Sequence, residues 1–302
     1  MRPLSAQAVH LPFEPGPYRM GMDLVSIPEA AWCELDDRYL PEMAERRRLL
    51  AEAHEDVFAA LPASDAARPE ALETIVTALI THHPDWFSRD GHTIRNHLTG
   101  ESWDIGSVDP LELAGRLVQE DWCLIQDSED GPVFTAAVLC FPSRWRLMEK
   151  IGKPLPAVHG PVPFYAHRLA GAVDRFMRHL KPGRIASRLN WSLLEDPALF
   201  QPGGKWRVDG GATVTPDNAG SHVFLRVERQ TVRRLPESGA VLFGIRVHVY
   251  PLDRVIARPE RAATLASAVR ALPAEILHYK SVLPFRDPLL QWLDARHGHA
   301  PA

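Results

Sequence analysis

Apolar residues recur at helical spacing through the first third of the chain. This spacing predicts a helix from Pro41 to Leu61, with the charged run Glu45 to Arg48 on its solvated face, and a second helix from Glu70 to Thr81. A third helix is expected directly after Asp109, because aspartate is a favourable cap and the proline that follows suits the first helical position. Residues 1 to about 20 are too rich in proline and glycine for a helix and are expected to form an extended arm.

From Trp122 onward the apolar pattern becomes that of strands. We predict a hairpin and then three further strands, at Trp122–Gln126, Val133–Phe141, Ile185–Leu193, Val223–Gln230 and Ala240–Tyr250. Later helices are expected at His167–Leu180, Arg261–Leu272 and Asp287–Arg296. The predicted fold class is α+β, an antiparallel sheet with helices on one side in the strand order of a PAS-like domain. We expect residues 1–120 to form the arm and a helical layer, 121–258 the PAS-like core, and 259–302 a C-terminal helical extension.

A proline-rich stretch, Lys153 to Pro163, interrupts this pattern and carries one histidine. Its four prolines fix φ and remove backbone donors, so we expect a stiff, extended connection and no helix. His159 lies between apolar Val158 and Gly160, which favours burial. A buried imidazole at such a position can be an axial metal or haem ligand, a general base, or a hydrogen-bonded core histidine, and the local sequence leaves these three roles open.

Polar residues alternate with apolar ones in the last two predicted strands. If the apolar sets of both strands share a face, Glu228 lies on the same face as Arg246 and His248. Alternation also places Arg226 on the side of Glu228, and Arg229 on the other side. This polar face is either a solvated surface with ion pairs or one wall of a pocket in which arginine and glutamate orient a small polar or cationic ligand.

Composition narrows the class of protein. A formal net charge of -4 gives no reason to expect a nucleic-acid or anionic-membrane partner. The three cysteines are widely spaced, which argues against a disulfide framework, a zinc ribbon or an iron-sulfur site in this chain and favours a cytoplasmic setting. There is no apolar run long enough to cross a bilayer and no signal-peptide pattern at the start.

Three stretches together resemble a known family, the haem-dependent oxidative N-demethylases, and specifically their haem-bearing alpha subunit. The stretches are Val158-His159-Gly160-Pro161-Val162-Pro163, then Arg188-Leu189-Asn190-Trp191-Ser192 with Leu199-Phe200-Gln201-Pro202, and finally Arg226-Val227-Glu228-Arg229-Gln230-Thr231-Val232-Arg233-Arg234-Leu235-Pro236. The resemblance extends over roughly residues 20 to 295. It implies a haem b in the PAS-like core, activation of O2, and removal of a methyl group from a small secondary amine such as dimethylamine, with release of formaldehyde.

The resemblance also implies partners and residue roles. Electrons would come from NADPH through a reductase subunit with FMN and a 2Fe-2S cluster, and a tetrahydrofolate-binding subunit would take up the one-carbon product. His159 is the expected axial ligand of the haem iron, on the strength of its proline mount, and Arg188 and Tyr165 are further expected cofactor contacts. In the catalytic site, Arg226 or Arg229 would stabilise negative charge on reduced oxygen, Glu228 would pair with an alkylammonium substrate, and Asn190 would add a neutral donor.

Two other functions remain open from the sequence. One is a haem-binding gas or redox sensor on the same scaffold, which would bind haem without demethylating amines. The other is a cofactor-free binding protein that keeps the fold.

Overall fold

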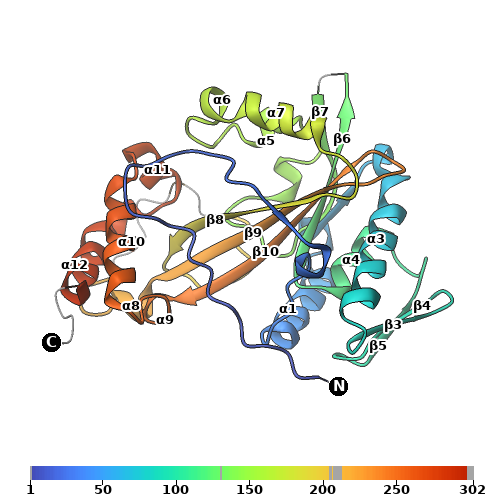
Figure 1. The fold of residues 1–302 in the computed structure, drawn as a ribbon, viewed down its shortest axis with the longest axis horizontal. Helices are drawn as coiled ribbons and strands as arrows, with labels where there is room; N and C mark the ends of the chain where they lie inside the picture. The colour runs from blue at the N-terminus through green and yellow to red at the C-terminus, as the bar shows by residue number, and fades with distance from the viewer. Residues whose placement is uncertain (1, 130, 204–205, 207–212, 298–302) are drawn as a thin grey trace.

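A computed structural model describes residues 2–129, 131–203, 206 and 213–297. In this part of the chain, seven strands form one antiparallel sheet in the order β1-β8-β9-β10-β6-β7-β2 (Figure 1). The strands are β1 (Val25–Ile27), β2 (Phe58–Ala60), β6 (Glu120–Ser128), β7 (Gly131–Val138), β8 (Ile185–Leu194), β9 (Phe224–Arg234) and β10 (Val241–Pro251). A separate three-stranded sheet contains β3 (Phe87–Asp90), β4 (Thr93–Asn96) and β5 (Glu101–Asp104).

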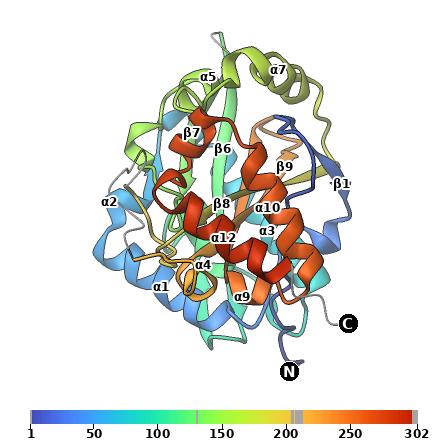
Figure 2. The same ribbon diagram turned by 90° about the vertical axis from the view of Figure 1, so that its left-hand side faces the viewer.

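The helices lie over both faces of the large sheet and at one end of it (Figures 1 and 2). They are α1 (Tyr39–Glu52), α2 (His54–Val57), α3 (Ala67–His82), α4 (Pro110–Leu117), α5 (Leu155–Val158), α6 (Tyr165–Arg168), α7 (Ala170–His179), α8 (Ala219–His222), α9 (Leu252–Val255), α10 (Pro259–Ala271), α11 (Ala274–Tyr279) and α12 (Arg286–His297). An α+β class is therefore confirmed. The expectation of helices on one side is wrong, because both faces of the central strands are apolar enough to need a cover.

Each face of the sheet has its own core. Trp122 and Leu242 pack with residues of α1, α3 and α4, whereas Val232 and Val241 pack with Leu155 of α5 and with residues of α7. A further core joins α10 and α12 to the ends of β9 and β10, and Figure 2 looks onto these helices. None of the described helices combines the length and the apolar character needed to cross a membrane.

The central strands and most helices match the predicted ranges. The predicted hairpin is β6 and β7, the three later strands are β8, β9 and β10, and Asp109 caps α4 by accepting a hydrogen bond from the Leu111 backbone N–H at 2.8 Å. The short edge strands β1 and β2, the three-stranded sheet and α11 were not predicted. The edge strands are only three residues long, which is too short for an alternating pattern to be visible.

The first predicted helix is shorter than expected and buries part of its charged run. The helix α1 ends at Glu52, and α2 and β2 take up the rest of the predicted range. Arg46 is fully buried, because its guanidinium pairs with Asp121 at 2.9 Å and donates to the Gln119 carbonyl at 2.9 Å. The prediction of a solvated face is wrong at this residue.

The proline-rich stretch is not the extended connection that was predicted. Leu155 to Val158 form one turn of helix, α5, and α6 begins at Tyr165. Proline is tolerated in the first turn of a helix, where its missing N–H has no intrahelical partner to lose. Pro154 is the N-cap residue of this turn and Pro156 lies in its first positions, and His159 directly follows the turn with φ -96° and ψ 2°.

The register of β9 and β10 overturns the predicted polar face. Arg246 pairs with Arg229, and Glu228 pairs with Val247, so Glu228 lies on the face opposite to Arg246 and His248. The backbone N–H of Leu235 bonds to the Ala240 carbonyl at 2.8 Å, which leaves four residues in the turn and pairs odd with even numbers. Since both faces are buried, the apolar pattern could not select the register.

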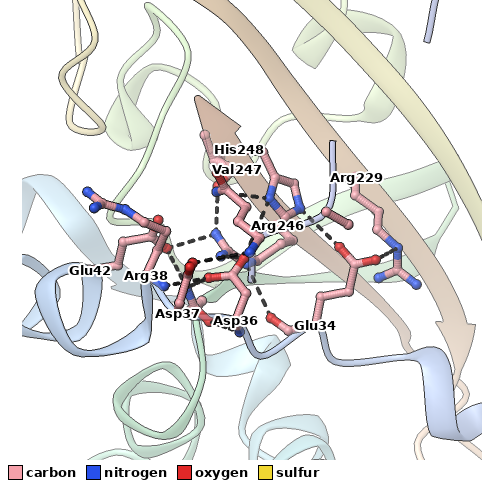
Figure 3. A network of polar contacts seen from close by, with 12 residues as sticks. Glu34, Asp36, Asp37, Arg38, Glu42, Arg229, Arg246, Val247 and His248 are labelled. Carbon is pink, nitrogen blue, oxygen red and sulfur yellow. Dashed lines mark hydrogen bonds and ion pairs between the residues drawn. The ribbon is translucent and has the colours of Figure 1, made fainter. Parts of the chain in front are cut away.

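The two faces of the large sheet carry different polar residues. The cavity face carries side chains that alternate along the strands, namely Arg188, Asn190, Arg226, Glu228, Gln230 and Phe243. The opposite face carries Trp122, Arg229, Arg246 and His248. On the opposite face, Arg246 bonds to Asp36 and Glu42, at 2.8 Å each, in the network drawn in Figure 3.

Burial of Glu120 leads to a prediction about stability against pH. Desolvation raises the pKa of this carboxyl from its ordinary value of 4.5 to about 7, and its Oε2 atom has no hydrogen-bond partner among the described residues. Between these two values the folded chain holds a proton that the unfolded chain has lost, so stability falls as pH rises. In the parent chain, Glu120 should make the unfolding free energy fall by roughly 3 kcal/mol between pH 5 and pH 8. We expect this fall to be absent in Glu120→Gln.

Urea denaturation at several pH values checks this expectation. Glu55→Gln, which changes an exposed carboxylate, serves as the control and should leave the dependence as it is in the parent chain. The same slope in the Glu120→Gln variant and the parent would contradict the assignment of a protonated, buried Glu120.

Candidate functional site

A cavity of about 1040 Å³ lies against the cavity face of the sheet. Its wall combines the central strands, residues of α5 to α7, residues of α10 and α11, and the chain from Leu11 to Val25. The volume is at the upper end of the ~300–1,000 Å³ range of small-molecule and cofactor sites. Much of the lining is apolar, from Ile125, Phe134, Leu155, Val158, Val162, Leu169, Val173, Phe176, Met177, Val232, Phe243 and Ile245.

The N-terminal arm, residues 2–24, covers part of this cavity. Figure 1 shows it in dark blue, crossing the sheet. Its backbone N–H at Gly16 bonds to the Ser267 hydroxyl of α10 at 3.4 Å, and Leu11 to Leu24 belong to the cavity wall. An extended arm was predicted, but its place in the wall was not, because contacts between distant segments leave no local pattern in a proline-rich sequence.

His159 lies in the cavity wall, half-buried, at the end of α5. Its Nδ1 atom is 2.9 Å from the Leu155 carbonyl oxygen, which can only accept a hydrogen bond. The proton therefore lies on Nδ1, and Nε2 is the basic nitrogen of the ring. The ring stacks on Tyr165, with centroids 4.4 Å apart and an interplanar angle of 9°, which fixes its plane.

Glu228 carries negative charge into the same cavity. Its Oε2 atom accepts hydrogen bonds from Asn190 at 3.2 Å and from Gln230 at 2.8 Å. Desolvation alone would raise the pKa of Glu228, but hydrogen bonds from Ser143 and Asn190 and the positive charge of Arg226 outweigh it, so the pKa is lowered. A carboxylate held ionised in a partly apolar cavity is a site for a cationic ligand.

Arg226 also lines the cavity, but its N–H donors bond to other groups of the protein. The guanidinium donates to the Ser143 hydroxyl at 2.9 Å and to backbone carbonyls of Phe141, Pro142, Ala198 and Leu199 at 2.9 to 3.2 Å. Burial lowers the pKa of Arg226 to about 10. These contacts tie two loops to β9, so Arg226 holds the cavity wall and places positive charge behind Glu228.

A lysine ammonium cannot make all the hydrogen bonds that the Arg226 guanidinium makes to the two loops, so Arg226→Lys is expected to destabilise the fold. Carbonyls left without a donor in a buried position cost about 1–3 kcal/mol, and we expect a loss of that size in the unfolding free energy. Chemical denaturation compares this variant with Arg146→Lys, a change at an exposed arginine that should have no effect of this size. Equal stability of the two variants would show that the carbonyl contacts of Arg226 contribute little.

Arg188 is a half-buried cation of the cavity wall. Desolvation lowers its pKa, and the charges of Asp23 and Glu228 oppose that shift. Its Nε atom is buried without a hydrogen-bond partner among the described residues, an arrangement that is costly unless a ligand supplies the acceptor. Arg188 therefore fits an anionic group of a bound molecule.

Arg229 does not belong to this cavity. It lies on the opposite face, where it donates to the carbonyls of Ala31 and Trp32, the latter at 2.9 Å, and pairs with Glu34 at 3.3 Å. The structure thus brings together His159, Tyr165, Arg188, Asn190, Arg226 and Glu228 and separates Arg229 from them. The alternation of β9 had predicted this separation.

Several residues of the wall were missed from the sequence. The alternation of β9 had placed Gln230 on the face of Glu228, but Gln230 was not assigned to the site. Ser143 and Tyr18 could not, because each is placed by contacts between segments far apart in the chain. Tyr279 and Lys280 were not missed: their place between two predicted helices had suggested that they close the pocket, and both line the cavity from the end of α11.

The family described as haem-dependent oxidative N-demethylase, alpha subunit-like, matches residues 24–290. This range includes the central sheet, the three quoted sequence stretches and the described helices from α1 to α11.

Proposed function

Because the chain belongs to the haem-dependent oxidative N-demethylase, alpha subunit-like family, we propose that it binds haem b and removes a methyl group from a small secondary amine such as dimethylamine. The observation that carries the proposal is the cavity that His159 and the ionised Glu228 share. A basic imidazole nitrogen suits an iron ligand, and a half-buried, ionised carboxylate suits an alkylammonium ion.

The residues of the cavity fit a haem. The imidazole of His159 is oriented through Nδ1 by the Leu155 carbonyl, as is usual for metal-binding histidines, and Nε2 is the nitrogen that would bind iron. Tyr165 would hold the imidazole plane, and the unsatisfied Nε of Arg188 would bond to a haem propionate. The apolar side chains below α5 and α7 would contact the macrocycle.

The order of the central strands supports a PAS-like core for this site. If β6 to β10 are numbered one to five along the chain, their order in the sheet is 2-1-5-4-3. The helical crossing that contains His159 joins the second of these strands to the third. We infer that this PAS-like part of the sheet holds the haem against its cavity face.

Glu228 would bind the substrate through its charge. Asn190 and Gln230 fix the carboxylate, and Arg226 lies behind it as a positioning residue. A secondary amine is protonated at neutral pH, so its N–H groups would donate to Glu228 and its methyl groups would turn toward the apolar part of the cavity. This arrangement selects small alkylammonium ions over neutral or anionic molecules.

Bound haem would supply the oxygen chemistry of the reaction. One atom of O2 would end in formaldehyde and the other in water, with two electrons taken from NADPH. The family is described as alpha subunit-like, which implies other subunits. We propose a reductase subunit with FMN and a 2Fe-2S cluster, and a tetrahydrofolate-binding subunit that accepts the one-carbon unit.

Turnover with a supplied reductant tests this function. The haem-loaded chain, given dimethylamine, O2 and a chemical or photochemical electron donor, should release formaldehyde in proportion to the amine consumed. Trimethylamine, a tertiary amine, and methylamine, a primary amine, are tested in the same way to compare them with the secondary amine. Haem that binds firmly, combined with no formaldehyde and no change of the haem spectrum on adding any of these amines, would contradict the proposal and favour a sensor.

A further inference from the structure

Two histidines and one glutamate meet on the opposite face of the sheet, away from the residues of the cavity face. The Nε2 atoms of His10 and His248 lie 3.1 Å and 3.0 Å from the same oxygen, Oε2 of Glu34. All three ligand atoms lie within 4.8 Å of one another. The residues come from the N-terminal arm, from the segment before α1 and from β10, and Figure 3 labels Glu34 and His248.

These distances match the coordination of a small divalent ion. A tetrahedral Zn²⁺ with bonds near 2.05 Å holds its ligand atoms roughly 3.3 Å apart. The two histidine–glutamate distances are already close to this value, so only the two imidazoles have to approach each other. His10 and Glu34 keep 20% and 29% of their side-chain surface exposed, which leaves room for a water molecule as a further ligand.

The surrounding groups can support a bound metal. The other ring nitrogen of His248, Nδ1, lies 3.4 Å from the side-chain Nε2 of Gln7 and 3.9 Å from Oδ2 of Asp36. When Nε2 binds metal, Nδ1 carries the proton, so the Gln7 amide has to turn and Nδ1 has to move closer to Asp36 to donate to it. The second oxygen of Glu34 is held by Arg229 at 3.3 Å. Although Arg246 is near, Asp36 and Glu42 pair with it and balance its charge.

We propose that His10, Glu34 and His248 form a divalent transition-metal site, best suited to Zn²⁺, that fastens the N-terminal arm to the sheet. Two imidazoles and one carboxylate with an open position are a common ligand set for zinc. The arm enters the cavity wall at Leu11, the residue directly after His10. A metal bound by His10 and His248 would therefore connect β10 to the N-terminal arm, which covers part of the cavity. The proposal does not depend on the haem function.

Metal titration of the full chain tests the site. The parent chain and the variants His10→Ala and His54→Ala are each stripped of metal with a chelator and then titrated with Zn²⁺ by calorimetry. His54 is a matched control, because it bonds to one carboxylate, Glu112, at 2.9 Å and is not part of the three-residue group. We expect about one Zn²⁺ per chain in the parent and in His54→Ala, and affinity reduced roughly a hundredfold or more in His10→Ala.

Proteolysis tests the effect on the arm. Arg19 is exposed, so trypsin can cut after it. In the parent, added Zn²⁺ should slow this cleavage, whereas in His10→Ala the cleavage rate should be the same with and without Zn²⁺. No stoichiometric binding, or equal affinity in His10→Ala and the parent, would overturn the metal site. Binding that leaves cleavage after Arg19 unchanged would overturn the fastening of the arm. Neither outcome affects the haem spectrum, so this test and that of the proposed function can fail separately.

Discussion

Replacement of His159 by alanine is expected to abolish stable haem binding, so that the purified variant lacks the Soret band of the parent. The physical reason is the loss of the axial nitrogen, whose orientation depends on the 2.9 Å contact between Nδ1 and the Leu155 carbonyl oxygen. Apolar contacts alone would leave a haem that is removed by gel filtration. Absorption spectra before and after gel filtration measure the effect.

His167→Ala is the matched control for this experiment. It removes an exposed imidazole from α6, two residues after the Tyr165 that stacks on His159. This variant should keep the haem and the spectrum of the parent. If His159→Ala retained a stoichiometric haem with an unchanged ferric spectrum, another residue would have to be the ligand.

Glu228→Gln is expected to lower kcat/KM for a secondary amine by roughly two orders of magnitude, while haem stays bound. Removal of one partner from a hydrogen-bonded charge pair costs about 2–5 kcal/mol, and a hundredfold loss, about 2.8 kcal/mol, lies within this range. The amide keeps the shape of the side chain but loses the charge that binds an alkylammonium ion. Formaldehyde release, together with spectral titration by dimethylamine, separates the loss of binding from a loss of haem.

Glu275→Gln serves as the control for the charge change. Glu275 is exposed on α11, next to Ile276 in the cavity wall, and its replacement should leave the kinetics of the parent. Undiminished amine turnover in Glu228→Gln would mean that the substrate binds elsewhere or in its neutral form. Glu228 would then line the cavity without binding the substrate.

The elements that the sequence predicted well are those whose signal is local. Alternation along β8 to β10 and the 3.6-residue period of α3 are visible within ten to sixteen residues. The cap of α4 needs only Asp109 and the proline that follows it. Likewise, alternation alone was enough to separate Arg226 and Glu228 from Arg229.

The features that the sequence predicted wrongly or did not reveal depend on contacts between distant segments. The register of β9 and β10 follows from a four-residue turn, and burial of both faces removed the usual clue. Arg226 had the residue type expected of a catalytic cation, yet its donors are taken by carbonyls of two loops that no local pattern connects to β9. His10 gave no signal, because its partners lie 24 and 238 positions away in the chain.

The absorption spectrum of the purified chain under CO tests the central claim most directly, namely that the cavity face holds a haem whose iron His159 binds. Expressed with ample haem, then reduced and exposed to CO, the protein should show a Soret band that shifts on CO binding, at about one haem per chain. A colourless protein, or a pigment that CO does not change and that gel filtration removes, would contradict the claim.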